Sequence, residues 1–392
     1  MFETLTPAKP DPILTIMAAF REDKRADKID LSVGVYKDEA GGTPIVAALR
    51  EAETRLHAGQ KTKAYIGPLG DAGFNEKMLD LTFGPDVERA RLRTAQTPGG
   101  CGGLRLLGDL IAAAQPDATV FMPDPTWVNH EPLLASAGLR LATYAYFDPT
   151  TGAVRFDAMM ADLGKARAGD VILLHGCCHN PTGADLDMVQ WKTLGAFMLK
   201  RGLFPLVDLA YQGLAFGLEE DAAPVRYLAS ILPEMAVATS CSKNFAAYRD
   251  RVGAAFILGA SPTAADIAGA KLATIGRGMW SMPPDHGAAA IRIVLEDAGL
   301  TAMWKAELNG MRTRIQTLRA NLASELNRLT NADFSFVTRQ TGMFSRLPLA
   351  DGQAQRLRAE RGVYILPDGR INIAGLNATN TAPFAEAFAE TR

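Results

Sequence analysis

Residues 235–244 read Met-Ala-Val-Ala-Thr-Ser-Cys-Ser-Lys-Asn. The first five are apolar or β-branched, which predicts a short strand buried on both faces, and a hydroxyl-rich turn that carries Lys243 follows at once. Similar short apolar runs alternate with amphipathic stretches through the middle of the chain, and we expect further strands at 92–97, 119–122, 171–175, 204–208 and 252–258. This alternation is typical of an α/β protein with a largely parallel sheet.

The pattern changes after about residue 301. Apolar residues from Met311 to Leu329 recur at three- and four-residue spacing, which predicts one long helix that begins near Thr301 and bends near Gly310. A coiled coil would give the same spacing, but only about three heptads are present and a globular continuation follows. We therefore expect this helix to join the α/β part to a second, smaller domain.

Composition excludes several classes of protein. Of the 392 residues 48% are hydrophobic, and 41 basic against 43 acidic residues give a formal net charge of -2, so intrinsic disorder and non-specific nucleic-acid binding are not expected. No apolar run is long enough to predict a membrane helix, which needs about 18 residues. The four cysteines, Cys101, Cys177, Cys178 and Cys241, do not resemble a disulfide framework, so we expect a reducing compartment, the cytoplasm.

Polar residues follow the predicted strands at the edge where open α/β sheets bind ligands. Lys243 lies between hydroxyl residues and is followed by Arg251, a combination that suits a Schiff base beside a bound phosphate. Asp208 ends another strand, where its carboxylate could pair with a pyridinium nitrogen, and Tyr211 follows in the next turn. For any one of these residues alone, a solvated surface position or a turn explains the sequence as well.

Two further turns are candidate binding elements. The glycines of residues 99–103 open an apolar helix, where free N–H groups bind anions, although as a dinucleotide fingerprint the run lacks its last glycine, because Arg105 stands there. The turn at residues 175–183 contains two histidines and two cysteines, but a metal site is not expected, since His175 and His179 have helical spacing on a segment that leaves a strand. This turn instead presents Asn180 at a third strand end.

Taken together, these residues resemble the aspartate and aromatic amino-acid aminotransferases, class I enzymes of the fold-type I pyridoxal phosphate group, from end to end of the chain. The stretches that carry the resemblance are Asp11-Pro12-Ile13-Leu14, Gly34-Val35-Tyr36-Lys37-Asp38, Asp124-Pro125-Thr126-Trp127, His179-Asn180-Pro181-Thr182-Gly183, Ala210-Tyr211-Gln212-Gly213, Ser242-Lys243-Asn244-Phe245, Gly342-Met343-Phe344-Ser345 and Gly369-Arg370-Ile371-Asn372. The resemblance implies a large domain, 46–310, with a mostly parallel seven-stranded sheet flanked by helices, and a smaller α+β domain formed by 1–45 and 311–392.

The resemblance also implies roles for individual residues. Lys243 would hold pyridoxal 5'-phosphate as a Schiff base and move the substrate proton, with Asp208 and its support His130 at the pyridine nitrogen. Asn180 and Tyr211 would bind the phenolic oxygen, and Trp127 would stack on the ring. The phosphate would be bound by Gly100, Cys101, Ser240, Ser242, Arg251 and, from the other subunit of a homodimer, Tyr65. Arg370, with Gly34, Trp127 and Asn180 nearby, would bind the substrate α-carboxylate, and Arg277 of the other subunit would reach its side chain.

The expected substrates are amino acids and 2-keto acids. Ala64, Cys101 and Met282 are smaller or less polar than their counterparts in enzymes that prefer dicarboxylates, so we expect aromatic amino acids or aspartate to donate to 2-oxoglutarate or oxaloacetate. A strict aspartate aminotransferase remains an alternative. From other classes, a nicotinamide-dependent dehydrogenase that uses residues 99–103 and a non-catalytic binding protein remain open.

Overall fold

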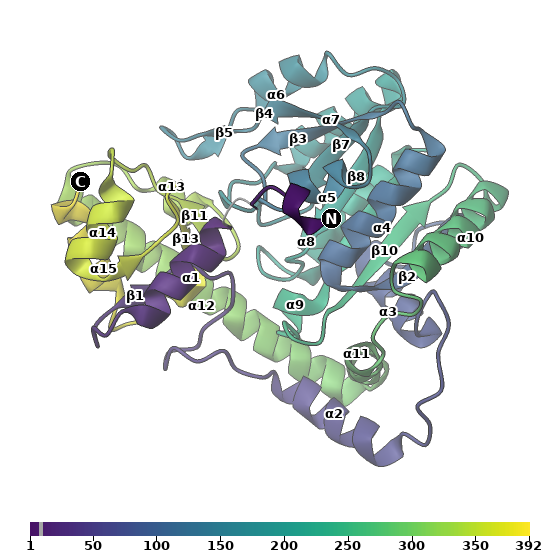
Figure 1. The fold of residues 1–392 in the computed structure, drawn as a ribbon, viewed down its shortest axis with the longest axis horizontal. Coiled ribbons are helices and arrows are strands. Elements are labelled where there is room, and N and C mark those ends of the chain that lie inside the picture. Colours follow the sequence, from purple (N-terminus) through teal and green to yellow (C-terminus); the bar gives the residue numbers. More distant parts are fainter. Residues whose placement is uncertain (8–10) are drawn as a thin grey trace.

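The computed structural model describes residues 1–7 and 11–392, and its larger part is built on a seven-stranded sheet (Figure 1). The strands lie in the order β2-β10-β9-β8-β7-β3-β4. Their bounds are β2 Leu92–Pro98, β3 Thr119–Asp124, β4 Arg140–Ala145, β7 Val171–His175, β8 Phe204–Leu209, β9 Met235–Ser240 and β10 Val252–Leu258. Only β10 runs antiparallel to its two neighbours, so the predicted α/β fold with a mostly parallel sheet is confirmed.

Helices cover both faces of this sheet because successive strand residues point to opposite sides. In β7, Val171 and Leu173 pack toward one layer of helices, whereas Ile172 and Leu174 pack toward the other. The first layer contains α4 Gly99–Ala114, α5 His130–Ala135 and α10 Pro262–Met279. The second contains α3 Ala72–Phe83, α6 Phe156–Leu163, α7 Met188–Arg201, α8 Leu218–Ile231 and α11 His286–Glu296. Strands buried on both faces therefore read as continuous apolar runs.

Two helix ends show how nearby and distant residues set the bounds of a helix. Gly202 ends α7 in the left-handed conformation, as its position after the helix predicts. Thr43 followed by Pro44 is a typical helix start, yet α2 (Ala47–Gly59) begins only at Ala47, because Glu307 accepts hydrogen bonds from the N–H groups of Ala47 and Ala48. A side chain distant in sequence therefore caps this helix.

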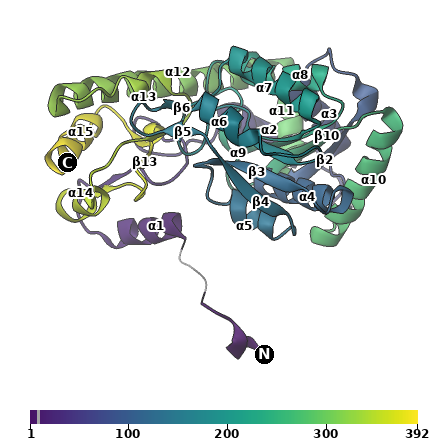
Figure 2. The same ribbon diagram turned by 90° about the horizontal axis from the view of Figure 1, so that it is seen from above.

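The long helix α12 (Ala298–Thr330) begins three residues earlier than expected, because the Asp297 side chain accepts a hydrogen bond from Leu300 N. It is continuous through Gly310. Figure 2 shows α12 running along both the sheet-containing part and the smaller part of the molecule. The predicted connecting helix is therefore present.

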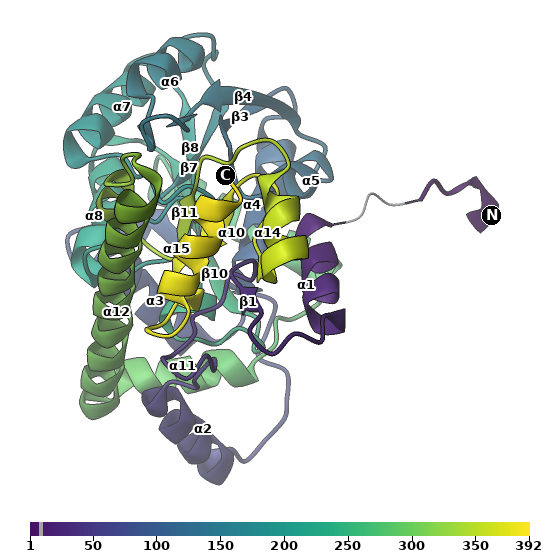
Figure 3. The ribbon, with the colours of Figure 1, turned by 90° about the vertical axis from the view of Figure 1, so that its left-hand side faces the viewer.

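The smaller part combines segments from the two ends of the chain (Figure 3). The strand β1 (Ile29–Asp30) pairs in parallel with β12 (Val363–Tyr364), and β11 (Phe344–Arg346) pairs antiparallel with β13 (Arg370–Asn372). The surrounding helices are α1 Pro12–Glu22, α13 Phe336–Arg339, α14 Gln353–Arg361 and α15 Thr381–Glu390. The remaining short elements are η1 Phe2–Thr4, η2 Arg89–Arg91, β5 Phe147–Asp148, β6 Ala153–Val154 and η3 Ile373–Gly375.

Two further observations concern the whole described chain. Within residues 1–7 and 11–392, no helix combines the length and the apolarity that crossing a membrane would require. All four cysteines are free thiols, and three of them are buried.

Candidate active site

A pocket of about 390 Å³ opens at the carboxyl edge of the sheet, next to β11 and β13 of the smaller part. It brings together twelve of the residues that the sequence singled out: Gly34, Gly100, Cys101, Trp127, Asn180, Asp208, Tyr211, Ser240, Ser242, Lys243, Arg251 and Arg370. Ile13, Leu104, Ala210 and Phe344 complete the lining. His130 lies behind Asp208, whereas Tyr65 and Arg277 do not line this pocket.

The parallel strands explain why these residues meet. The strands β2, β7, β8 and β9 all end at one edge of the sheet, and the turn after each carries polar groups into the same space. Lys243 lies in the short helix α9 (Cys241–Asn244), whose first turn is capped by the Ser240 side chain at the end of β9. Asp208 lies in β8, directly opposite Ala238 of β9.

Lys243 is the nucleophilic group of the pocket. Its Nζ lies 5.8 Å from the centre of the Tyr211 ring and 5.1 Å from that of Tyr248. Burial, together with the positive charges of Arg251 and Arg370, lowers the pKa of Lys243 from 10.5 to about 8. At neutral pH a larger share of this side chain than of an ordinary lysine is therefore the neutral amine, the form that attacks a carbonyl.

A chain of hydrogen bonds supports the Asp208 carboxylate from behind. His130 Nε2 lies 3.1 Å from Asp208 Oδ2, and His130 Nδ1 lies 2.8 Å from Thr126 Oγ1, which is 3.0 Å from His175 Nε2. Burial lowers the pKa of His175 to about 3, so its ring is neutral. Because a carboxylate can only accept, His130 donates from Nε2, and its Nδ1 bonds the Thr126 hydroxyl. The chain therefore fixes the orientation of the carboxylate that faces the pocket.

The opposite end of the pocket is suited to an anion. The helix α4 starts with Gly99 and Gly100, and the preceding residue, Pro98, provides no side-chain cap. The first backbone N–H groups of the helix therefore have no side-chain partner and are available to an anion in the pocket. Ser240, Ser242 and Arg251 surround these groups, and Arg251 donates to Ser242 Oγ at 3.4 Å. A Cβ atom on Gly99 would lie 2.6 Å from Arg251 Nη2, so glycine allows this close packing.

Arg370 forms the cationic wall on the side of the smaller part. Its guanidinium donates to Ser32 O at 2.8 Å and to Asn180 Oδ1 at 3.4 Å, and it lies 4.6 Å from the centre of the Phe344 ring. The side chain is 3% exposed, yet its Nε has no hydrogen-bond partner. A buried donor without a partner is costly, and a carboxylate bound by this planar group would satisfy it.

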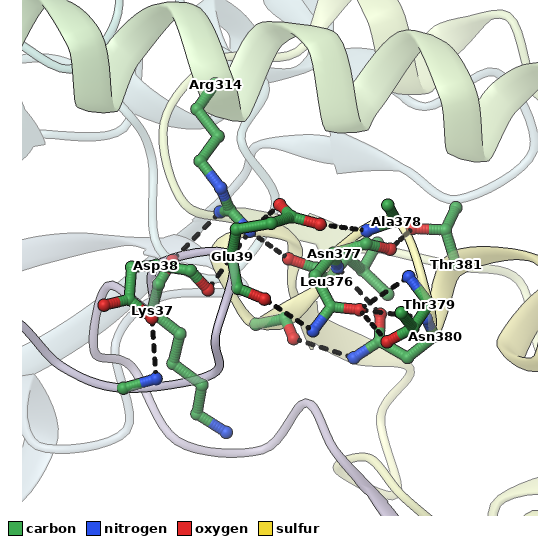
Figure 4. A network of polar contacts seen from close by, with 12 residues as sticks. Lys37, Asp38, Glu39, Arg314, Leu376, Asn377, Ala378, Thr379, Asn380 and Thr381 are labelled. Atoms are coloured by element: carbon green, nitrogen blue, oxygen red, sulfur yellow. Dashed lines mark hydrogen bonds and ion pairs between the residues drawn. The ribbon is translucent and has the colours of Figure 1, made fainter.

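Arg314 of α12 holds the chain just after Gly34, at residues 37–39 (Figure 4). Arg314 donates to Lys37 O at 2.9 Å, to the Glu39 carboxylate at 3.1 Å and to Leu376 O at 2.7 Å. At the other end, a Cβ on Gly34 would lie 2.8 Å from Phe344 Cζ. The backbone at residue 34 therefore lies so close to the Phe344 ring that any larger side chain would clash with it.

Tyr65 and Arg277 lie on the surface, outside the Lys243 pocket. Tyr65 is 88% exposed and lines a separate hollow with Ala64 and Met282. Arg277, in the last turn of α10, is exposed and donates to Ser281 Oγ. The sequence expectation that both act at the site of another subunit is compatible with these positions, and it stays a prediction.

The turn at 175–183 supplies Asn180 to the pocket, with a cis peptide bond between Asn180 and Pro181. Among the described residues, Cys177, Cys178 and Asp221 place potential ligand atoms within 4.8 Å of one another. The Asp221 oxygens, however, already accept hydrogen bonds from four backbone N–H groups, and burial raises the pKa of the Cys178 thiol. These groups are therefore already satisfied without a metal.

Sequence reasoning gave no role to two aromatic residues at the pocket. Phe344 contacts Arg370 and lies edge-on to the Tyr211 ring, and Tyr248 lies beside Lys243 while its hydroxyl accepts from Tyr36 N at 2.8 Å. Phe344 stands in a stretch that carries the resemblance, but an isolated aromatic residue is as compatible with an ordinary core position. Only the pairing of β11 with β13 places it beside Arg370.

The fold and the pocket together define an enzyme site in which a lysine amine, a carboxylate and an anion-binding helix terminus converge. The chain belongs to the family described as "Aminotransferase class I and II", whose family profile matches residues 26–388. It is 46% identical over 99% of both chains to a tyrosine aminotransferase of Rhizobium meliloti (strain 1021), and 44% identical over 99% of both chains to an aspartate aminotransferase of Escherichia coli (strain K12).

Solved structures agree with this assignment. An aromatic amino acid aminotransferase with 3-indolebutyric acid superposes with a TM-score of 0.97 at 45% identity, with all of both chains covered. An aromatic-amino-acid aminotransferase from Burkholderia pseudomallei, covalently bound to pyridoxal phosphate, also gives a TM-score of 0.97, at 39% identity and with 100% of this chain and 99% of that chain covered. The chain is therefore a transaminase, and the predicted fold class is confirmed.

The nicotinamide-dependent dehydrogenase hypothesis is not supported. Relatives that match the whole chain are aminotransferases, and in residues 99–103, on which the hypothesis rested, Gly99 and Gly100 pack against Arg251 and Ser240 of the lysine pocket. The glycines therefore build the anion end of the lysine pocket.

Proposed function

We propose that this transaminase moves amino groups from aromatic amino acids or aspartate to 2-oxoglutarate or oxaloacetate. As a class I and II aminotransferase it uses pyridoxal phosphate, which supplies an electron sink for the bonds at the substrate α-carbon. The observation that carries the proposal is the position of Lys243 between an anion-binding helix terminus and the supported Asp208 carboxylate. The residues present therefore fit the cofactor.

The pocket residues divide into three groups that would hold this cofactor. The phosphate fits the N-terminus of α4 with Gly100, Cys101, Ser240, Ser242 and Arg251. Asp208, held by His130, would accept from the protonated pyridine nitrogen, and Trp127 would cover one ring face. Asn180 and Tyr211 would donate to the phenolic oxygen, and burial raises the pKa of Tyr211, which keeps its proton available for donation.

Lys243 is proposed as both the attachment point and the proton carrier. Its lowered pKa allows Nζ to be a neutral base that accepts the proton from the substrate α-carbon. Once protonated, Nζ can return that proton to an adjacent atom, and the rings of Tyr211 and Tyr248 lie beside it at 5.8 and 5.1 Å. Lys243 Nζ alone can therefore take up the proton from the α-carbon and release it again to the adjacent atom.

Arg370 is proposed to orient the substrate through its α-carboxylate. Its planar guanidinium can bind a carboxylate through two hydrogen bonds, and the partnerless Nε provides one of the donors. Asn180 lies next to it on the other wall. A carboxylate held here would present the α-carbon to Lys243.

A homodimer with shared sites is part of the proposal. Tyr65 is 88% exposed, so its ring and hydroxyl are free to contact a partner subunit. Tyr65 would reach the phosphate and Arg277 the substrate side chain in the partner's pocket. The domain division at 46–310 against 1–45 and 311–392, with closure of the smaller part over substrate, and a cytoplasmic location belong to the same proposal; four free thiols support the location.

The range of substrates rests on the less polar residues near the proposed side-chain site. Ala64 and Met282 line one surface hollow with Tyr65, and Cys101 lines the Lys243 pocket. Apolar surroundings lower the cost of replacing water by an aromatic ring. Relatives named for tyrosine, aromatic amino acids and aspartate support both donor classes, and a strict aspartate enzyme is the alternative.

Two measurements test these proposals. The purified protein should be yellow, and borohydride should bleach it and fix a pyridoxyl group on Lys243; a colourless protein, or labelling elsewhere, would contradict the assignment. A coloured protein that turns over no amino acid with 2-oxoglutarate would instead be a binding protein. A kcat/KM for phenylalanine more than about 10⁴-fold below that for aspartate, about 5.5 kcal/mol, would favour the strict aspartate enzyme.

A further inference from the structure

Arg319 is a buried cation that the proposed reaction does not use. It projects from α12, is 2% exposed and donates to the carbonyl oxygens of Val337, Thr341, Gly342 and Phe344 and to Ser345 Oγ. No carboxylate of the described chain pairs with it within 4.0 Å, and burial lowers its pKa to about 10, so it stays charged at neutral pH. A charge held in this way fixes the backbone of residues 341–345.

Asp185 holds the neighbouring turn after β7, and it too lies outside the lining of the pocket. One carboxylate oxygen accepts from His179 N at 2.8 Å, and the other accepts from Cys178 N at 2.7 Å and from the Thr341 hydroxyl. Residues 178 and 179 immediately precede Asn180 in the chain. Asp185 therefore fixes the turn that presents Asn180.

Thr341 connects the buried Arg319 to the half-buried Asp185. Its hydroxyl donates to Asp185, its carbonyl accepts from Arg319 Nη2 at 2.8 Å, and its N–H donates to Gly183 O at 2.8 Å. One residue thus joins the turn after β7 to the segment that leads into β11. Every polar group of Thr341 takes part in this connection.

Thr341 is linked in this way to both walls of the site proposed for the substrate carboxylate. On one side, the turn held by Asp185 carries Asn180. On the other, Phe344 is opposite Asn372 in the β11–β13 pair, and its ring lies against the Arg370 guanidinium. The two walls also contact each other directly, because Arg370 donates a hydrogen bond to Asn180 at 3.4 Å. A shift of residue 341 would therefore change the separation of Asn180 and Arg370.

We propose that Thr341, held between Asp185 and Arg319, is a positioning residue that sets the spacing of Asn180 and Arg370 for the substrate α-carboxylate. The proposal rests on the proposed function, in which Arg370 and Asn180 receive that carboxylate. Thr341 does not line the pocket, so its effect is transmitted through the two walls. A planar guanidinium binds a carboxylate through two hydrogen bonds only at the correct separation and angle, so a small displacement weakens binding.

The test replaces the hydroxyl alone. Thr341→Val keeps the size of the side chain and the backbone groups that bond Arg319 and Gly183, and we expect KM for both the amino acid and the keto acid to rise about tenfold, equivalent to about 1.4 kcal/mol, with kcat changed less than about threefold. Thr341→Ser should restore both KM values to within about threefold of wild type. Thr338→Val is the matched control, because its hydroxyl bonds only the nearby Ser335 O.

Direct binding separates positioning from a structural role. The dissociation constant of 3-phenylpropionate, measured on the cofactor-loaded enzyme, should rise about tenfold in Thr341→Val and remain unchanged in Thr338→Val. A lower melting temperature with unchanged KM and dissociation constant would overturn the proposal. Should Thr341→Val fail to fold, Thr341→Ala carries the same expectation.

Arg370→Lys distinguishes this proposal from the proposed function. If Arg370→Lys leaves the affinity for 3-phenylpropionate unchanged, Arg370 is not the group that binds the carboxylate, and the proposed function fails. If Arg370→Lys weakens binding but Thr341→Val does not, the positioning role alone is refuted.

Discussion

Replacing Lys243 by Met is expected to stabilise the cofactor-free protein. The pocket lowers the pKa of Lys243 from 10.5 to about 8, mainly through burial and then through Arg251 and Arg370. A pKa difference of about 2.5 corresponds to about 3 kcal/mol of unfolding free energy that the folded protein loses when it holds this side chain protonated. Met has a similar length and no charge, so it removes this loss.

The pH dependence gives the prediction its sign. Below about pH 8 the folded and the unfolded protein both hold the proton, and the full loss is present. Between about pH 8 and 10.5 the unfolded chain still binds the proton whereas the folded protein has released it, so the stability of the wild-type protein rises with pH. The advantage of Lys243→Met should therefore be largest at pH 7 and shrink through this window.

Urea unfolding of the cofactor-free proteins, at one protein concentration and at pH 7, 8, 9 and 10, measures the difference. Lys192→Met, at an exposed position of α7, is the matched control and should show no comparable pH-dependent gain. A Lys243→Met protein that is no more stable than wild type at pH 7 would refute the reasoning. So would a gain of the same size at every pH.

Three other substitutions give separable results. Arg370→Lys keeps the charge but loses one charged hydrogen bond, about 1.5–3 kcal/mol, so kcat/KM should fall roughly 10- to 100-fold for aspartate and phenylalanine alike; a loss for one substrate only would exclude an α-carboxylate role. Arg277→Leu should lower kcat/KM for aspartate at least 100-fold and for phenylalanine less than about tenfold, and equal losses would contradict its side-chain role. Glu307→Ala removes the acceptor of the first N–H groups of α2 and should lower the unfolding free energy by about 1 kcal/mol, with Glu325→Ala as the control; an unchanged urea midpoint would show that this cap is dispensable.

The parts of the site that the sequence predicted are those that follow directly from a strand. A short apolar run identifies the strand, and the polar residue after it must lie at the carboxyl edge, which is how Lys243, Asp208 and Asn180 could be placed near one another. The strands 171–175 and 252–258 were predicted with the observed bounds. Local pattern alone was sufficient there.

The features that sequence reasoning missed depend on contacts between distant segments. Glu307 caps α2 from 260 positions away, and Thr43 with Pro44 offered a more obvious local start. The antiparallel direction of β10 leaves no mark in its own residues, since a buried strand is apolar in either direction. Phe344 gains its position beside Arg370 only from the pairing of β11 with β13.

The pairing of charges at the Lys243 pocket differs from that on the rest of the described surface. Elsewhere on the described surface arginines pair with acids, as Arg93 does with Asp266 and Arg226 with Glu219. In the described chain no carboxylate oxygen lies within 4.0 Å of the charged side-chain nitrogens of Lys243, Arg251 or Arg370, and the two arginines lower the pKa of the lysine. A protein with a formal net charge of -2 thus keeps an excess of positive charge in one pocket, where Asp208 faces Lys243, Arg251 and Arg370. Because a bound phosphate and a bound carboxylate would each neutralise part of it, the same repulsion that destabilises the cofactor-free protein favours anionic cofactor and substrate.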